Sequence, residues 1–375
     1  AAVLKPQELL LGCGPSTVAG ALWHAVAAGA MAQGVQIIDA GVCTLPQLRH
    51  AQASLRTDGA AWVGDDRLIP LNENGARLSA RQQRAIATLN ARQDYSGPFS
   101  GLTRPILSAG ATEIAYIADA AAIFEADPQK APKVAMHAQS PHLLSLAERA
   151  FARAGLTLRA GWEDDMMELA PGELGVWLDD RGEAAAFSDE DGALSEAQQQ
   201  LLRSWIALEY GERELLLHVS ATRAAAELAE RYHARATYIA GERSVWMNAL
   251  AEQSPLQFAL WFDGLRSALY ALSLLTEKGL TLAAWREIVP RIHRRSRIVD
   301  VPSSETGRIL HAFAEREKNA ELGGGVRFCR DDGWAWICPD EQRSEFRIVT
   351  ESASAEFARE LCDFCERELK TMSQK

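Results

Sequence analysis

Two cysteines near the end of the printed sequence have a spacing that could bind a metal. Cys362 and Cys365 form a C-x-x-C pair, and structural zinc sites use such pairs. A tetrahedral site needs a second pair, and the nearest other cysteines, Cys329 and Cys338, are widely spaced. Residues 356–370 have amphipathic helical periodicity, in which positions three apart share a face. We therefore expect both thiols to pack in a core.

A short basic stretch could bind phosphate. Residues 291–297 read RIHRRSR, and clustered arginines nominate an anion-binding patch. The stretch is isolated in an acidic chain, so the sequence favours a solvated face over a phosphate site.

Composition excludes several classes of protein. The 375 residues carry 39 Lys and Arg against 50 Asp and Glu, a formal net charge of −11. Binding nucleic acid without sequence preference requires a basic surface, so no nucleic-acid partner is expected. No apolar run reaches the ~18 residues of a membrane span. Six cysteines make no disulfide framework. With no basic-apolar leader, we expect a cytoplasmic protein without a membrane span.

Strands and helices alternate along most of the chain. Short apolar runs followed by Gly or Pro breakers alternate with Ala-rich helical stretches, which predicts parallel sheets with crossover helices. After a helix over 308–318 the pattern changes to strands at turn-separated spacing and a closing helix. The expected strands lie at 9–12, 36–39, 133–137, 175–178, 214–219, 236–239, 325–329, 333–337 and 346–350, and the other helices at 17–33, 142–154, 222–233 and 356–370. The pattern predicts α/β modules followed by an antiparallel α+β module.

Six segments, in order along nearly the whole chain, resemble the α-D-phosphohexomutase superfamily of phosphomannomutases and phosphoglucomutases. Each is a weak match alone, and their shared order strengthens the resemblance. They are 40–46 (AGVCTLP), 71–78 (LNENGARL), 177–184 (WLDDRGEA) with 189–192 (DEDG), 241–245 (GERSV), 263–269 (DGLRSAL), and 325–347 with its PDEQRSEFR segment.

The resemblance implies an architecture and a chemistry. It implies three similar mixed-sheet α/β modules and a C-terminal antiparallel α+β module around a central cleft, with modules at 1–128, 129–192 (shortened), 193–300 and 301–375. Members of the family move a phosphoryl group between O1 and O6 of a hexose through a phosphoserine and Mg²⁺. Such chemistry requires a nucleophilic hydroxyl, clustered carboxylates for the cation and fixed donors for the distal phosphate.

The nucleophile is missing at the position that the resemblance gives it. Counting back from 74–75 places Pro70 on the proline of the family's TASHNP loop, and the serine position then falls on Arg67. A guanidinium binds phosphate but cannot carry it. No serine occurs between Ser54 and Ser79, so a small shift of register does not supply one.

The metal loop is altered as well. Aligned on Gly182, the family's three aspartates correspond to Asp179, Arg181 and Glu183. A cation in the middle repels Mg²⁺, and a shifted set of Asp179, Asp180 and Glu183 is the weak alternative. We expect no cofactor, with Mg²⁺ only if the protein is an enzyme, and we expect Arg67 to neutralise Asp179 and Glu183 in place of the metal.

The two binding loops also depart from the family's pattern. Glu252 and Ser254 resemble the middle of the sugar-binding GEXSG loop, although an exposed helix end explains them equally well. In the phosphate loop Cys338, Asp340 and Gln342 stand at the Arg, Ser and Thr positions. The remaining candidates to bind a phosphate or sugar are Arg67, Arg181, Glu252, Ser254, Arg343 and Arg347.

Two functions follow from these losses. The first is a phosphohexomutase-like pseudoenzyme with a regulatory or assembly role in sugar-nucleotide or polysaccharide metabolism, whose partner is a sugar phosphate or a protein. The alternative is a divergent phosphomannomutase or phosphoglucomutase with relocated residues. The sequence names neither the ligand nor the oligomeric state.

Overall fold

The structure is a computed structural model that describes residues 7–92, 105–161, 168–317, 320–340 and 345–373. It forms two compact units. The first contains Ala1–Leu194 and Met247–Arg286, and the second contains Ser195–Trp246 and Glu287–Lys375.

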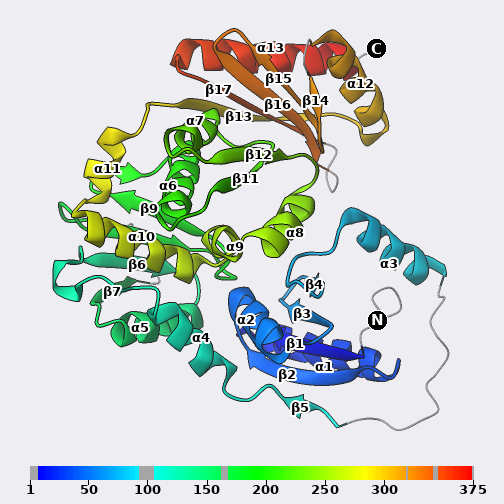
Figure 1. The fold of residues 1–375 in the computed structure, drawn as a ribbon. Helices are drawn as coiled ribbons and strands as arrows, with labels where there is room; N and C mark the ends of the chain where they lie inside the picture. Colours follow the sequence, from blue (N-terminus) through cyan, green and yellow to red (C-terminus); the bar gives the residue numbers. More distant parts are fainter. Residues whose placement is uncertain (1–6, 93–104, 162–167, 318–319, 341–344, 374–375) are drawn as a thin grey trace. The chain divides into compact units, whose positions relative to one another are not determined.

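The first sheet of the first unit has the strand order β4-β3-β1-β2-β5 (Figure 1). All neighbouring strands run parallel except β4, which is antiparallel to β3. Its strands are β1 (Glu8–Cys13), β2 (Gln36–Val42), β3 (Gly59–Val63), β4 (Leu68–Leu71) and β5 (Leu107–Ser108), and its helices are α1 (Thr17–Met31) and α2 (Leu45–Leu55).

Alternation of side chains along β1 explains why this sheet is covered on both faces. Leu10 packs in one core cluster with residues of α2, and Leu11 packs in another with Trp23 of α1. Neighbouring residues of a strand point to opposite faces, so a continuous apolar run requires a helix on each side.

The second sheet has the order β10-β9-β8-β6-β7, and it too is mixed because β8 and β9 are antiparallel. Its strands are β6 (Val134–Ala138), β7 (Leu158–Gly161), β8 (Leu174–Leu178), β9 (Ala185–Asp189) and β10 (Gly192–Ala193). The other helices of this unit are α3 (Ala80–Arg92), α4 (Thr112–Ala121), the 3₁₀ turn η1 (Pro128–Lys130), α5 (Pro141–Arg153), α9 (Pro255–Phe262) and α10 (Gly264–Lys278). Two helices, α8 (Arg243–Gln253) and α11 (Leu282–Ile288), cross the boundary between the units.

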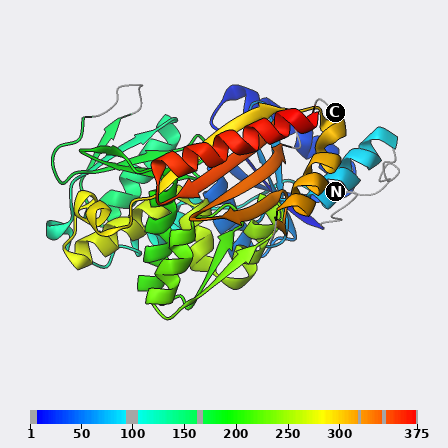
Figure 2. The same ribbon diagram turned by 90° about the horizontal axis from the view of Figure 1, so that it is seen from above.

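The second unit holds a two-stranded parallel sheet and a five-stranded antiparallel one. The antiparallel sheet has the order β13-β17-β16-β15-β14, and α13 lies across it (Figure 2). The elements are α6 (Glu196–Glu209), β11 (Glu214–His218), α7 (Arg223–Arg231), β12 (Arg235–Ile239), β13 (His293–Asp300), η2 (Ser303–Glu305), α12 (Thr306–Arg316), β14 (Glu321–Leu322), β15 (Val326–Arg330), β16 (Gly333–Asp340), β17 (Glu345–Ser352) and α13 (Ala355–Ser373).

The predicted fold class is confirmed: mixed α/β sheets come first and an antiparallel sheet with helices comes last. Cys362 and Cys365 both lie in the core between α13 and that sheet, which confirms the packing interpretation. The third sheet has two strands among the described residues. The division into four modules stays a prediction.

The basic stretch lies mostly on an exposed strand, as the sequence favours, with one exception. Residues 293–300 form β13, an edge strand of the antiparallel sheet, and most of its residues are exposed. Arg294 is buried rather than solvated: its side chain is 7% exposed, contacts Glu196 and Glu351, and lies over the Trp334 ring.

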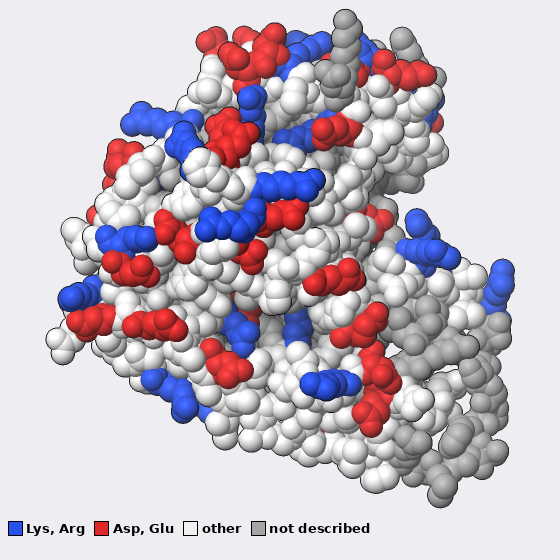
Figure 3. All heavy atoms as spheres, viewed as in Figure 1, with Lys and Arg blue, Asp and Glu red and all other residues white. Residues whose placement is uncertain are grey.

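No single helix in the described part of the chain is long and apolar enough to cross a membrane. The pair α9 and α10 has the length and composition together but bends by 108° between its two helices. On the face that Figure 3 shows, basic and acidic side chains are interspersed rather than gathered by sign.

Candidate functional site

The acidic turn that the sequence singles out connects β8 to β9. Asp179 closes the turn, since its Oδ1 accepts a hydrogen bond from the backbone N–H of Ala184 at 3.1 Å. Gly182 has φ +73°, and a Cβ there would lie 3.2–3.4 Å from Leu143 and Thr44. The positive φ favours a glycine here, and a larger residue would also crowd the two neighbouring side chains.

Glu183 is a buried carboxylate held by three arginines. Oε1 accepts from Arg49 at 2.6 Å, Oε2 accepts from Arg77, and Nε of Arg181 lies 3.9 Å from Oε2. Burial alone would raise the pKa of Glu183, but Arg49 and Arg77, with a smaller effect from Arg181, lower it to about 2. Glu183 is therefore ionised at neutral pH.

Arg49 ties three separate segments of the unit together. From α2, its Nε donates to the carbonyl of Gly75 at 2.8 Å and its Nη1 to that of Phe262 at 3.0 Å. Its third nitrogen donates to Glu183. Burial lowers the pKa of Arg49, and Glu183 opposes that effect. Sequence reasoning missed Arg49 because nothing in its local pattern reveals a partner 134 positions away.

Arg181 lies among the carboxylates that would have to bind a metal. Its guanidinium is 3.6 Å from Asp179, 3.3 Å from Asp180 and 3.9 Å from Glu183. Mg²⁺ requires oxygen ligands in near-octahedral geometry. Here a fixed cation lies among those oxygens, and Arg49 and Arg77 already bind both oxygens of Glu183. The residues present do not fit Mg²⁺. Among the described residues, no group of three or more His, Cys, Asp or Glu could hold a metal.

Arg67 pairs with Asp66 and not with Asp179 or Glu183, so the prediction that it neutralises those two carboxylates is wrong. It lies in the turn between β3 and β4 and pairs with its neighbour Asp66, with Nε and Nη2 at 2.7 and 2.6 Å from the two carboxylate oxygens. The hydrogen bond from Arg67 lowers the pKa of Asp66. Asp66 adjoins Arg67 in the chain, and Glu183 is already paired with Arg49 and Arg77. Within the acidic turn, Asp180 acts on Arg67 electrostatically.

The sugar-loop candidates have structural roles in this unit. Ser254 is 3% exposed and caps α9, accepting from the N–H of Gln257 at 3.2 Å. Exposed Glu252 accepts from Asn74 at 3.4 Å. The segment 241–244 (GERS), which the sequence matched to another family segment, has a local contact of its own. There Ser244 Oγ donates to Glu242 at 3.2 Å.

The phosphate-loop candidates belong to the second unit. Arg347 is exposed on β17, and its Nε donates to Ser296 at 3.3 Å. Arg343 lies outside the described residues. The structure thus brings Asp179, Asp180, Arg181 and Glu183 together in one turn, with Arg49 and Arg77 as partners that the sequence did not reveal.

Comparison with known proteins identifies the fold. No family model and no curated protein matches the chain. Among solved structures, a phosphoglucomutase/phosphomannomutase family protein from Burkholderia thailandensis is 15% identical, with 97% of this chain and 89% of that one covered and a TM-score of 0.78. A putative phosphomannomutase from Thermus thermophilus is 13% identical over 97% and 90%, with a TM-score of 0.73.

This chain has the phosphohexomutase fold. A Paramecium phosphoglucomutase, parafusin, extends the likeness at 10% identity over 100% and 89% of the chains, with a TM-score of 0.65. The TM-scores and coverages establish the phosphohexomutase fold, and the resemblance that the sequence motifs suggested is confirmed at that level. The chemistry has to be argued from the side chains.

Proposed function

We propose that this protein is a phosphohexomutase-fold pseudoenzyme, in which an arginine–carboxylate network replaces the metal centre. The observation that carries the proposal is the position of Arg181 among Asp179, Asp180 and Glu183. Phosphoryl transfer is accelerated by positioning and by cations that stabilise developing charge. A guanidinium already paired to the protein's own carboxylates does not supply that charge to a substrate.

The nucleophile supports the same conclusion. The motif register puts Arg67 where the family carries its serine, and the Arg67 guanidinium pairs with Asp66. Arginine can bind a phosphate bidentately but forms no phosphoryl intermediate. We therefore assign the protein a binding role, regulatory or in assembly, in carbohydrate metabolism, with a sugar phosphate or a protein as its ligand.

A mutase assay tests the proposal. Wild-type protein and Arg67→Ser are incubated with glucose 1-phosphate or mannose 1-phosphate, catalytic hexose 1,6-bisphosphate and Mg²⁺. An active phosphoglucomutase serves as the positive control. We expect no turnover above the blank for either protein, because Arg67→Ser restores a hydroxyl but leaves Arg181 among the carboxylates. Turnover by either protein would establish the alternative, a divergent phosphohexomutase.

A further inference from the structure

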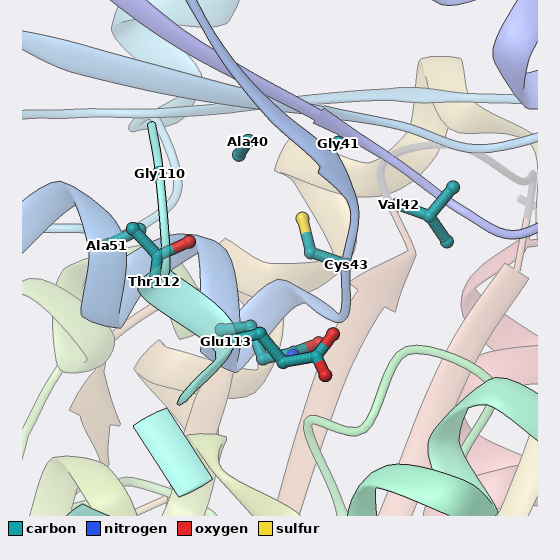
Figure 4. Close-up of a pocket in the computed structure, with 9 residues that line it drawn as sticks. Ala40, Gly41, Val42, Cys43, Ala51, Gly110, Thr112 and Glu113 are labelled. Carbon is teal, nitrogen blue, oxygen red and sulfur yellow. The ribbon is translucent and has the colours of Figure 1, made fainter. Parts of the chain in front are cut away.

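A cavity of about 220 Å³ opens in the first unit at the carboxyl ends of the parallel strands β2 and β5 (Figure 4). Its walls come from the end of β2, from α2 and from the start of α4. In open α/β sheets, ligands bind outside the carboxyl ends of the strands. A cavity of about 150 Å³ holds a benzene molecule, so this one has room for a single six-membered ring that bears hydroxyl groups.

Gln47 of α2 presents an unused hydrogen-bond donor to this cavity. Its Oε1 accepts from the backbone N–H of Thr44 at 2.7 Å, as part of the capping box of α2, and this bond fixes how the amide is oriented. The residue is 4% exposed, and its Nε2 has no partner in the described parts of the chain. A buried donor without a partner costs free energy, so a ligand oxygen that accepts from Nε2 is stabilised.

The first turn of α4 supplies further donors to the same cavity. Its N-cap residue is Ala111, which makes no side-chain capping bond. The backbone N–H groups of Thr112 and Glu113 therefore have no acceptor among the residues that the structure describes, and both residues line the cavity. The positive end of the helix dipole lies at this turn, so it too favours a ligand oxygen.

Glu113 supplies the acceptor that the cavity otherwise lacks. Its Oε1 pairs with Arg149, while Oε2 has no partner in the described segments, so Oε2 can accept a hydrogen bond from a ligand. Cys43 lines another part of the wall. Burial, followed by the charges of Cys13 and Asp39, raises the pKa of its thiol, so Cys43 stays uncharged and offers a weakly polar contact surface.

Together these groups select a neutral, hydroxylated ligand. An anion would lie beside the carboxylate of Glu113, and the described residues that line the cavity include no Lys, Arg or His. An ammonium group could bind Glu113 but would leave the Gln47 amide and the N–H groups of α4 unpaired. A hydroxyl group both donates and accepts, so a ring with several hydroxyls can satisfy the carboxylate and the donors at once.

We propose that this cavity binds one cyclic polyol, a neutral six-membered ring whose hydroxyls donate to Glu113 Oε2 and accept from Gln47 Nε2 and from the first turn of α4. The cavity shares no lining residue with the turn at 179–183, so the proposal does not depend on whether the protein is a pseudoenzyme. For a ligand of about 12 non-hydrogen atoms, ordinary ligand efficiency gives a dissociation constant on the order of 1 mM.

Saturation-transfer NMR on the full chain tests the site with two probes, D-glucose and myo-inositol. We expect at least one of them to bind saturably, with a dissociation constant on the order of 1 mM. Thr112→Val keeps the shape and removes the hydroxyl, and it should weaken binding about threefold. Glu113→Gln removes the charge and should weaken binding about tenfold. Ile114→Thr, at a residue that is 60% exposed and outside the lining, is the matched control and should leave binding unchanged.

The remaining outcomes each count against the proposal. Absence of saturable binding by both probes at about ten times that dissociation constant would overturn it. So would equal binding by wild type, Thr112→Val and Glu113→Gln, or methylammonium binding more tightly than either probe. Circular dichroism confirms that the variants are folded, which we expect because the Glu113–Arg149 pair is partly exposed, at 36% and 50% of the two side chains, and such pairs contribute little to stability.

Discussion

Glu183→Gln should lower the free energy of unfolding by about 3–5 kcal/mol, which is the range for breaking a buried ion pair by removing one partner. The substitution keeps the shape of the side chain and removes its charge. Arg49, which is buried, then has no carboxylate bound to it, and Arg77 and Arg181 lose one of their partners. The loss is large against the 5–15 kcal/mol by which proteins are stable.

Urea unfolding followed by tryptophan fluorescence measures this loss. A chain with two compact units can show two unfolding transitions, so the free energy is taken from the transition whose midpoint the substitution shifts. Asp180→Asn in the same turn is the control. Its side chain is 62% exposed, so its loss should cost less than about 1 kcal/mol. Equal effects of the two substitutions would show that the network around Glu183 does not hold the turn.

Acid should remove the same stabilisation. The pKa of Glu183 is lowered to about 2 in the folded protein from a usual value of 4.5. A carboxyl with a lowered pKa stabilises the fold fully above its unfolded pKa, and this contribution is lost as pH falls through the folded pKa. The contribution of Glu183 should therefore disappear between about pH 4.5 and pH 2 in the wild type, and it should be absent from Glu183→Gln.

His218 should make the second unit sensitive to acid at a higher pH. Burial, followed by the charges of Arg243, Arg294 and Arg327, lowers its pKa from 6.5 to about 4. The unfolded chain then binds a proton below about pH 6.5 that the folded protein does not accept until about pH 4. Stability should fall across that interval by on the order of 2–3 kcal/mol.

Histidine-resolved NMR titration measures the pKa of His218 directly, and urea unfolding at pH 7 and pH 5 measures its consequence. His218→Gln should flatten the dependence of stability on pH between 6.5 and 4. His311→Gln, at a surface histidine whose side chain is 73% exposed, should leave that dependence unchanged. A measured pKa of His218 near 6.5 would show that burial and the three arginines do not lower it, and would contradict this prediction.

Local periodicity predicted about half of the helices and strands that the structure describes, and β13 is among those that it missed. The runs 9–11 and 215–217 each consist of three leucines, so their burial is visible in the sequence itself. β13 is rich in arginine, which favours a solvated surface in any local interpretation. Most of β13 is indeed exposed, and the burial of the Arg294 side chain depends on Trp334 and Glu351, which come from two strands that follow later in the chain.

The residues of the acidic turn could be predicted from the sequence, but the arginines that pair with Glu183 could not. The turn at 179–183 and the absence of a serine near Arg67 could be recognised from motif order. The partners of Glu183 could not, because Arg49 and Arg77 are 134 and 106 positions away in the chain. An ion pair between such distant residues is decided by the fold, and a sequence pattern shows only that the charges exist.

Divalent-cation binding tests the central claim most directly. Mn²⁺ is a paramagnetic substitute for Mg²⁺ and can be titrated into the wild-type protein, with bound metal followed by electron paramagnetic resonance and calorimetry. We predict no saturable site with a dissociation constant below about 1 mM, the weak end of the range for oxygen-ligand sites, because Arg181 lies among the carboxylates. One tightly bound Mn²⁺ per chain that is lost in Asp179→Asn would contradict the account.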